Sequence, residues 1–146
     1  QLVPLLRAGY VVLCDRYIFT AFARDTVRGC PSEWVRELYS FAAHPDLTFF
    51  FKADLEVSLQ RILVGRPELK HFEAGLDLRL SNDAEESFRI FQGRILDQYL
   101  AMSSEFKFHI VDANQPIEAQ QSLVREVVAS RIDLSAFVGP MPLDRL

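Results

Sequence analysis

Residues 10–20 read YVVLCDRYIFT, an apolar run that ends abruptly in an aspartate and an arginine. The apolar part, 10–14, is continuous rather than alternating, which is typical of a strand buried on both faces of a parallel sheet. The following residues, 15–28, have helical character and end at Gly29. This stretch therefore predicts a strand, a polar turn and a helix, the repeating unit of an α/β fold.

The same alternation continues along the chain. Two more apolar runs, 47–51 and 106–111, are predicted to be buried strands, and Phe49 to Phe51 and Phe88 are predicted core residues. Helices are predicted at residues 1–8, 32–41, 55–64, from Asp83 onward, and from 116 to about 131. We therefore expect an α/β fold, with a parallel sheet and flanking helices, as one domain over residues 1–134.

Two segments lack a helical or strand pattern. Residues 65–82 are polar, contain glycine and are only weakly periodic, so we interpret them as a mobile loop or lid. Residues 135–146 contain two prolines and a glycine and are predicted to be irregular.

The composition excludes several classes of protein. With 146 residues and a net charge of −4, the chain has no nucleic-acid footprint. No segment approaches the roughly 18 apolar residues of a membrane span, and the start is not expected to be a signal peptide. The two cysteines form no metal-binding pair, and Cys14 is predicted to be a buried thiol. Two unpaired cysteines fit a reducing, cytoplasmic setting. The first residue is not methionine, so the chain is expected to begin within a longer protein.

Polar residues follow each predicted strand. Ligands bind at the carboxyl ends of the strands in such sheets, which directs attention to residues 15–16, 52–54 and 112–114. Arg16 can make a bidentate contact to a phosphate, and Asp15 can hold Mg²⁺ beside the same phosphate. The alternative is an ordinary salt bridge between the two at a strand end.

Six segments in order resemble the thymidylate kinase family, and together they cover nearly all of residues 9–131. The strand that ends in Asp-Arg-Tyr, with a hydroxyl residue at Thr20, resembles the family's acceptor motif. The other matching segments are Pro45-Asp46-Leu47-Thr48, the arginines of 61–66, Phe72-Glu73, the long helix containing 87–100, and the strand and loop at 111–118.

This resemblance implies a P-loop nucleoside monophosphate kinase fold and transfer of the ATP γ-phosphoryl group to dTMP or a related deoxynucleotide, with Mg²⁺. The implied catalytic residues are Asp15, Arg16 and Arg66, and Asp15 is the implied Mg²⁺ ligand. The implied acceptor-binding residues are Arg16, Tyr17, Thr20, Arg24 and Asp25. The implied ATP-binding residues are Arg61, Arg66, Ala113, Asn114 and Gln115.

Several of these residues have a second interpretation. Arg61 could belong to the solvated face of its helix, and Asp112 could cap the next loop instead of touching a ligand. Glu73 either orients a lid arginine or is merely exposed, and His71 is expected to be exposed. Arg24 and Asp25 depart from the aromatic and amide residues usual in the family, so they either change the acceptor preference or point outward.

The sequence contains no GxxxxGK[ST] phosphate loop within residues 1–146. In the family's strand order, the strand that precedes this loop lies between the strands expected at 10–14 and 47–51. We therefore expect an upstream segment to supply that strand and the loop, and we expect this chain alone to be inactive. The alternatives are a non-catalytic binding or assembly module and a kinase for a different phosphorylated acceptor; a homodimer is a further expectation by analogy.

Overall fold

The computed structural model describes residues 2–137, which form two short parallel strands surrounded by helices. The elements in chain order are α1 (Leu2–Arg7), α2 (Tyr17–Val27), α3 (Ser32–Leu38), β1 (Phe49–Lys52), α4 (Leu55–Gly65), the 3₁₀ turn η1 (Leu76–Leu78), α5 (Ala84–Glu105), β2 (His109–Asp112), α6 (Ile117–Arg131) and the 3₁₀ turn η2 (Leu134–Ala136).

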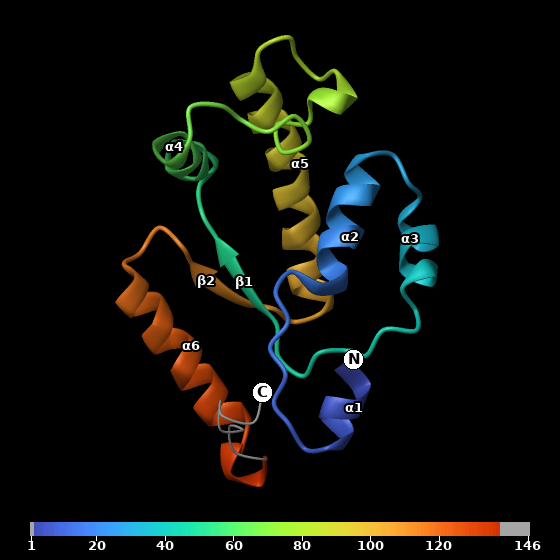
Figure 1. Cartoon of the computed structure of the whole chain (residues 1–146), viewed down its shortest axis with the longest axis vertical. Coiled ribbons are helices and arrows are strands. Elements are labelled where there is room, and N and C mark those ends of the chain that lie inside the picture. Colours follow the sequence, from blue (N-terminus) through green and yellow to red (C-terminus); the bar gives the residue numbers. More distant parts are fainter. Residues whose placement is uncertain (1, 138–146) are drawn as a thin grey trace, which may run out of the picture.

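The sheet consists of β1 and β2, paired in parallel from Phe49 opposite His109 to Lys52 opposite Asp112. In Figure 1 the two strands lie between α6 on one side and the long helix α5 with α2 on the other. Parallel strands require a crossover connection, and here α4, residues 66–82 and α5 make it. The predicted α/β class with a parallel sheet is confirmed.

The strand predicted at 10–14 does not form within the described chain. These residues run as extended chain without a sheet partner; Val11 is 44% exposed and Leu13 is 93% exposed. A strand exists only where a neighbour accepts its N–H groups and donates to its carbonyls, and residues 2–137 supply none beside this segment. For the same reason the prediction of a buried Cys14 is wrong, because its side chain is exposed.

The remaining boundaries shift by a few residues. The prediction was two residues too early for β1, and β2 starts only at His109, after Lys107 with a φ of 55°. Helix α3 ends at Leu38 instead of Phe41. Phe88 is buried as predicted, but Phe51 is 50% exposed because it faces an open groove.

The core lies mainly between α2 and α5. Phe19 and Phe22 of α2 and Phe91 of α5 belong to one buried cluster, and the Phe19 ring lies 4.7 Å from that of Phe108. Burying one such side chain contributes roughly 1.5–3 kcal/mol. This packing fixes α2, whose other face carries the polar residues considered below.

A second, smaller cluster lies beneath residues 66–82. Leu59 of α4 and Phe88 of α5 are each 2% exposed there, together with the fully buried Ala74. The segment predicted to be a lid is therefore attached to the body through its own small core.

Some features lie at the surface or at the limits of the description. Trp34 and Leu38 of α3 are more than half exposed, as is Phe41 beyond its end. In residues 2–137, no helix combines the length and apolar character that crossing a membrane would require. The irregular tail predicted from residue 135 begins within η2, and its residues 138–146 lie outside the described chain.

Candidate functional site

One face of α2 is polar, and it lines an open hollow of about 690 Å³. The buried positions of the helix, Ile18, Phe19, Phe22 and Ala23, face the core. Positions four apart recur on one side of a helix, so Thr20 and Arg24 share the opposite side, and Arg16 and Arg28 flank the two ends of the helix. The residues lining the hollow are Asp15, Arg16, Tyr17, Thr20, Ala21, Arg24, Asp25, Arg28 and Phe72. The fold thus gathers in one place every residue predicted to bind the acceptor, and Arg24 and Asp25 do not point away from it.

The backbone turns sharply where α2 begins. Arg16 has φ 66° and ψ −44°, Tyr17 has φ 43°, and the Tyr17 amide donates to the Asp15 carbonyl at 2.8 Å. This is a γ-turn of the rare, strained type, and non-glycine residues with positive φ concentrate at functional sites. The turn lifts Asp15 and Arg16 away from the helix, and both side chains are exposed.

Two hydroxyl groups hold this turn in place. The Tyr17 hydroxyl donates to the Ala43 carbonyl at 2.9 Å, and the Thr20 hydroxyl donates to the Arg16 carbonyl at 3.1 Å. The Thr20 hydroxyl also lies 3.1 Å from the hydroxyl of Tyr99 on α5. Both residues line the hollow, but their hydroxyl groups are engaged in fixing its geometry.

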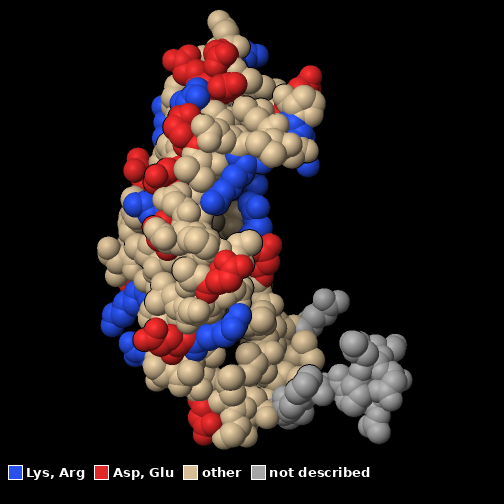
Figure 2. Space-filling view, turned by 90° about the vertical axis from the view of Figure 1, so that its left-hand side faces the viewer, with Lys and Arg blue, Asp and Glu red and all other residues tan. Residues whose placement is uncertain are grey.

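The hollow offers positive charge. Within residues 2–137, neither Arg16 nor Arg24 takes part in an ion pair, and Asp15 does not pair with Arg16. The salt bridge considered as an alternative for Asp15 and Arg16 is therefore not formed. Figure 2 shows basic side chains gathered around a notch on one face of the molecule. Arginines without a carboxylate partner are suited to hold a phosphate by bidentate hydrogen bonds.

Asp15 is suited to be a single carboxylate ligand of Mg²⁺. No group of three or more His, Cys, Asp or Glu side chains that could hold a metal ion occurs in the described part of the chain. Mg²⁺ is commonly held by one or two carboxylates, with substrate phosphates and waters completing the shell. Asp15 is exposed, lines the hollow next to Arg16, and forms no ion pair with any residue of 2–137, so its oxygens can serve in this way.

Arg66 lies outside the hollow and is held by a glutamate. Its guanidinium forms an ion pair with Glu73, whose carboxylate also accepts a hydrogen bond from the Lys70 amide at 3.4 Å. Of the two interpretations of Glu73, the structure shows the one in which it orients a lid arginine. Glu73 also borders the groove that Asp15 and Arg16 line, whereas His71 is exposed at the surface.

The loop after β2 is held by residues from α4 and its own backbone. The Arg61 guanidinium donates to the Ala113 carbonyl at 2.9 Å, and the Asp54 amide donates to Asn114 Oδ1 at 3.1 Å. Asp112 caps the loop, accepting from the Asn114 amide at 2.9 Å and the Gln115 side chain at 3.0 Å. These hydrogen bonds lower the pKa of the Asp112 carboxyl below its usual range. All the residues predicted to bind ATP except Arg66 thus belong to one ordered unit.

A second, larger groove of about 820 Å³ separates the unpaired segment 10–14 from β1. Val11 and Leu13 lie on one side, and Phe49 and Phe51 of β1 lie on the other. Its lining is mainly apolar and includes Asp15 and Arg16 at one end. The groove is therefore continuous with the polar site.

The sequence predictions missed Arg28 and the role of Phe72 as part of the hollow. The spacing of four from Arg16 through Thr20 and Arg24 to Arg28 was a signal that could have identified the arginine. The position of Phe72 depends on the folding of residues 66–82 and has no local signal. Arg66 and Arg61 lie outside the hollow that contains the predicted acceptor residues.

The sequence of this chain is similar to those of known proteins. The family model described as thymidylate kinase matches residues 1–124. The chain is 38% identical over 135 residues to probable thymidylate kinase 2 of Saccharolobus solfataricus, covering 92% of this chain and 63% of that protein. It is 28% identical to a probable thymidylate kinase of Staphylothermus marinus, covering 90% and 59% of the two chains. A thymidylate kinase of Staphylococcus epidermidis is 29% identical, with 86% and 61% covered. The chain thus spans about three fifths of the length of these relatives.

Proposed function

Because the chain belongs to the thymidylate kinase family, we propose that it forms the acceptor, lid and adenine-side parts of a nucleoside monophosphate kinase. The complete enzyme transfers the γ-phosphoryl group of ATP to dTMP or a related deoxynucleotide. The observation that carries the proposal is the hollow along α2, where Arg16, Arg24 and Asp25 lie together beside the carboxylate of Asp15.

The residues around the hollow have distinct roles in this proposal. Arg16 binds the phosphate of the acceptor, because its strained turn leaves the side chain exposed and it forms no ion pair within residues 2–137. Asp15 holds Mg²⁺ or its waters; the ion supplies positive charge that stabilises the transferring phosphoryl group. Arg66, oriented by Glu73, adds positive charge when the lid closes. Such a reaction depends mostly on alignment and electrostatic stabilisation, which arginines provide.

The donor side is formed by the loop after β2. Ala113, Asn114 and Gln115 border the adenine, and Arg61 fixes the loop through its bond to the Ala113 carbonyl. In this arrangement Arg61 acts on ATP binding by ordering the loop.

The phosphate loop of the complete enzyme comes from an upstream segment in this proposal. One further strand, inserted between residues 10–14 and β1, would pair both exposed backbone edges and cover the apolar groove. The loop after that strand would then lie at the end of the groove where Asp15 and Arg16 are found. The groove supports this placement, and no lysine is among the described residues that line it.

The test is Mg²⁺-dependent ATP turnover with each deoxynucleoside monophosphate, measured on the natural polypeptide that contains this chain and on the 146-residue chain itself. Turnover by the longer form alone, with dTMP preferred, is the expected result. Silence from a well-folded longer form across the whole panel would refute the kinase and favour a non-catalytic binding module.

A second candidate function is a kinase for an acceptor other than dTMP. The lining of the hollow by Arg24 and Asp25 favours it, because this pair offers a different set of donors and acceptors from that of an aromatic and an amide residue. Sites built on fixed hydrogen bonds reject mismatched substrates strongly. In the same panel, a preference for another nucleotide that Arg24→Ala abolishes would support this second function.

A further inference from the structure

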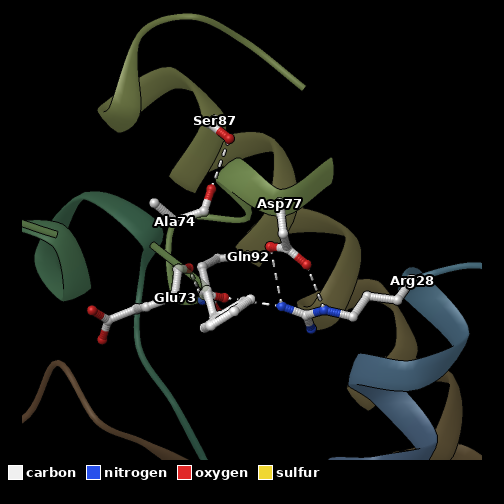
Figure 3. Close-up of polar contacts among 7 residues, drawn as sticks. Arg28, Glu73, Ala74, Asp77, Ser87 and Gln92 are labelled. Atoms are coloured by element: carbon white, nitrogen blue, oxygen red, sulfur yellow. Dashed lines mark hydrogen bonds and ion pairs between the residues drawn. The ribbon is translucent and has the colours of Figure 1, made fainter. Parts of the chain in front are cut away.

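Arg28, at the end of α2, ties that helix to the base of the lid. Its Nε donates to Asp77 Oδ2 at 3.0 Å, and its Nη2 donates to the Phe72 carbonyl at 3.0 Å. The side chains of Arg28 and Asp77 are only 21% and 22% exposed, so water screens this pair less than a pair at the open surface. Figure 3 shows the guanidinium of Arg28 reaching from α2 toward Asp77.

The partner of Arg28 is a well-anchored segment, residues 72–78, which we call the lid base. Ser87 of α5 is fully buried and donates to the Ala74 carbonyl at 2.7 Å, while Gln92 donates to the Glu73 carbonyl at 2.8 Å (Figure 3). Gly75 has φ 67°, and a Cβ there would lie 2.6 Å from Phe91 Cγ. The lid base is thus held on α5 by close packing and by buried hydrogen bonds.

Arg28 connects the lid base to α2, which forms the other wall of the hollow. The guanidinium lies 4.6 Å from the centre of the Phe91 ring, which limits its freedom further. Arg28 and Phe72 both line the hollow, and the Phe72 side chain presents an exposed aromatic face, with 61% of the residue accessible. The Arg28 guanidinium therefore adds a direct link between α2 and the residue that carries this aromatic ring.

We propose that Arg28 is a positioning residue, which holds the lid base against α2 and thereby sets the place of Phe72 in the acceptor hollow. This rests on the proposed function. The 11 residues of α2 lie between Arg16 and Arg28, and a helix rises 1.5 Å per residue, so the two backbones are roughly 16 Å apart. The Arg28 side chain is directed to the lid base and not to Arg16. Its two hydrogen bonds to the lid base already use the guanidinium. Arg28 acts through Phe72, on the part of the acceptor that lies away from the phosphate.

The kinetic test compares two arginines that make similar contacts in different places. In the natural full-length polypeptide, Arg28→Ala is expected to raise the KM for the acceptor about tenfold and to leave the KM for ATP within about twofold of wild type. Arg36→Ala is the matched control: Arg36 pairs with Glu105 of α5 and lies over the Phe22 and Phe106 rings, remote from the hollow. Like Arg28→Ala, this variant loses an ion pair and cation–π contacts, but its KM for the acceptor should equal that of wild type.

A double-mutant cycle identifies the partner. Asp77→Ala should also raise the acceptor KM, and the double variant Arg28→Ala/Asp77→Ala should be no worse than Arg28→Ala alone, because the two residues act through one contact. Arg28→Lys should lie between wild type and Arg28→Ala, since a lysine keeps the charge but loses the fork that reaches both Asp77 and Phe72.

Hydrogen exchange without nucleotide provides a readout independent of turnover. Arg28→Ala should speed exchange of the lid-base amides about tenfold, and Arg36→Ala should not. If the wild-type protein phosphorylates no nucleotide, the proposed function fails, while this exchange still reports on the contact. The proposal is overturned if Arg28→Ala leaves the acceptor KM unchanged, whether or not exchange accelerates, or if Arg36→Ala raises it equally.

Discussion

Two segments of this chain, 10–14 and β1, are both mainly apolar but have different structures. β1 pairs with β2 over its whole length, and its Phe50 packs on the main core. Residues 10–14 have no sheet partner, and Leu13 is 93% exposed. Apolar content alone does not produce a strand, because each backbone N–H and C=O also needs a neighbour.

The difference has a consequence for function, because both segments lead into the predicted sites. β1 is followed by Asp54, which binds the ordered loop after β2. The unpaired segment is followed by Asp15 and Arg16, which are exposed and lack internal partners among the described residues. The loop that we propose borders adenine is therefore ordered within this chain, and the residues proposed to bind phosphate are open toward the groove.

The largest expected effect is on hydrogen exchange of residues 10–14. If an upstream strand fills the groove, these amides should exchange at least roughly 1,000-fold more slowly in the full-length polypeptide than in the 146-residue chain. Amides of β1 that bond β2 should be protected in both forms. The exchange rates can be measured by mass spectrometry. Equal rates for residues 10–14 in the two forms would show that no upstream strand pairs with this segment.

The next effect, on activity, compares the cation near the end of the unpaired segment with the one that ends β1. Arg16→Ala in the full-length polypeptide should reduce kcat/KM by roughly 100- to 1,000-fold, because the group proposed to bind the phosphate is lost. Lys52→Ala, at the end of β1, is the control and should change activity little. Circular dichroism should show that both variants keep their fold; near-normal activity of a folded Arg16→Ala variant would refute the role assigned to Arg16.

A smaller effect concerns stability in the 146-residue chain. Val111→Ala in β2, where the side chain is 1% exposed, should lower the free energy of unfolding by about 2 kcal/mol. Leu13→Ala should change it by less than about 0.5 kcal/mol, because this side chain is almost fully exposed. In the full-length polypeptide, Leu13→Ala should instead cost about 2–5 kcal/mol. Urea unfolding of both variants in both forms measures these free energies. The same small cost of Leu13→Ala in the two forms would contradict the prediction.

The smallest effect is the pH dependence contributed by Asp112, which ends β2. Its pKa is lowered in the folded protein, so its stabilising contribution is present above the unfolded value, near 3.8, and is lost as the pH falls through the lower folded value. Asp112→Asn should therefore flatten the decline of Tm below about pH 5. Superimposable Tm profiles of wild type and variant would show that the loop hydrogen bonds do not depend on the charge.

Much of the architecture was predictable because its signals are local. The helix stop at Gly9, with a φ of 82°, and the cap at Asp83, which accepts from the Glu86 amide, are set by a few neighbouring residues. The polar residues at the strand ends were also found, because parallel strands bring their carboxyl ends to one edge. The strand at 10–14 was predicted wrongly because pairing depends on a distant segment.

The sequence by itself determined the α/β class, the family and the residues that the fold gathers along α2, because periodicity and motif order are properties of the chain. Only the tertiary structure decided that Arg28 and Phe72 join that site, that Glu73 orients Arg66, and that Arg61 holds the loop at Ala113. These contacts connect residues on different elements, and their geometry depends on how helices pack. No local pattern records that packing, since it results from the free energy of burying many side chains at once.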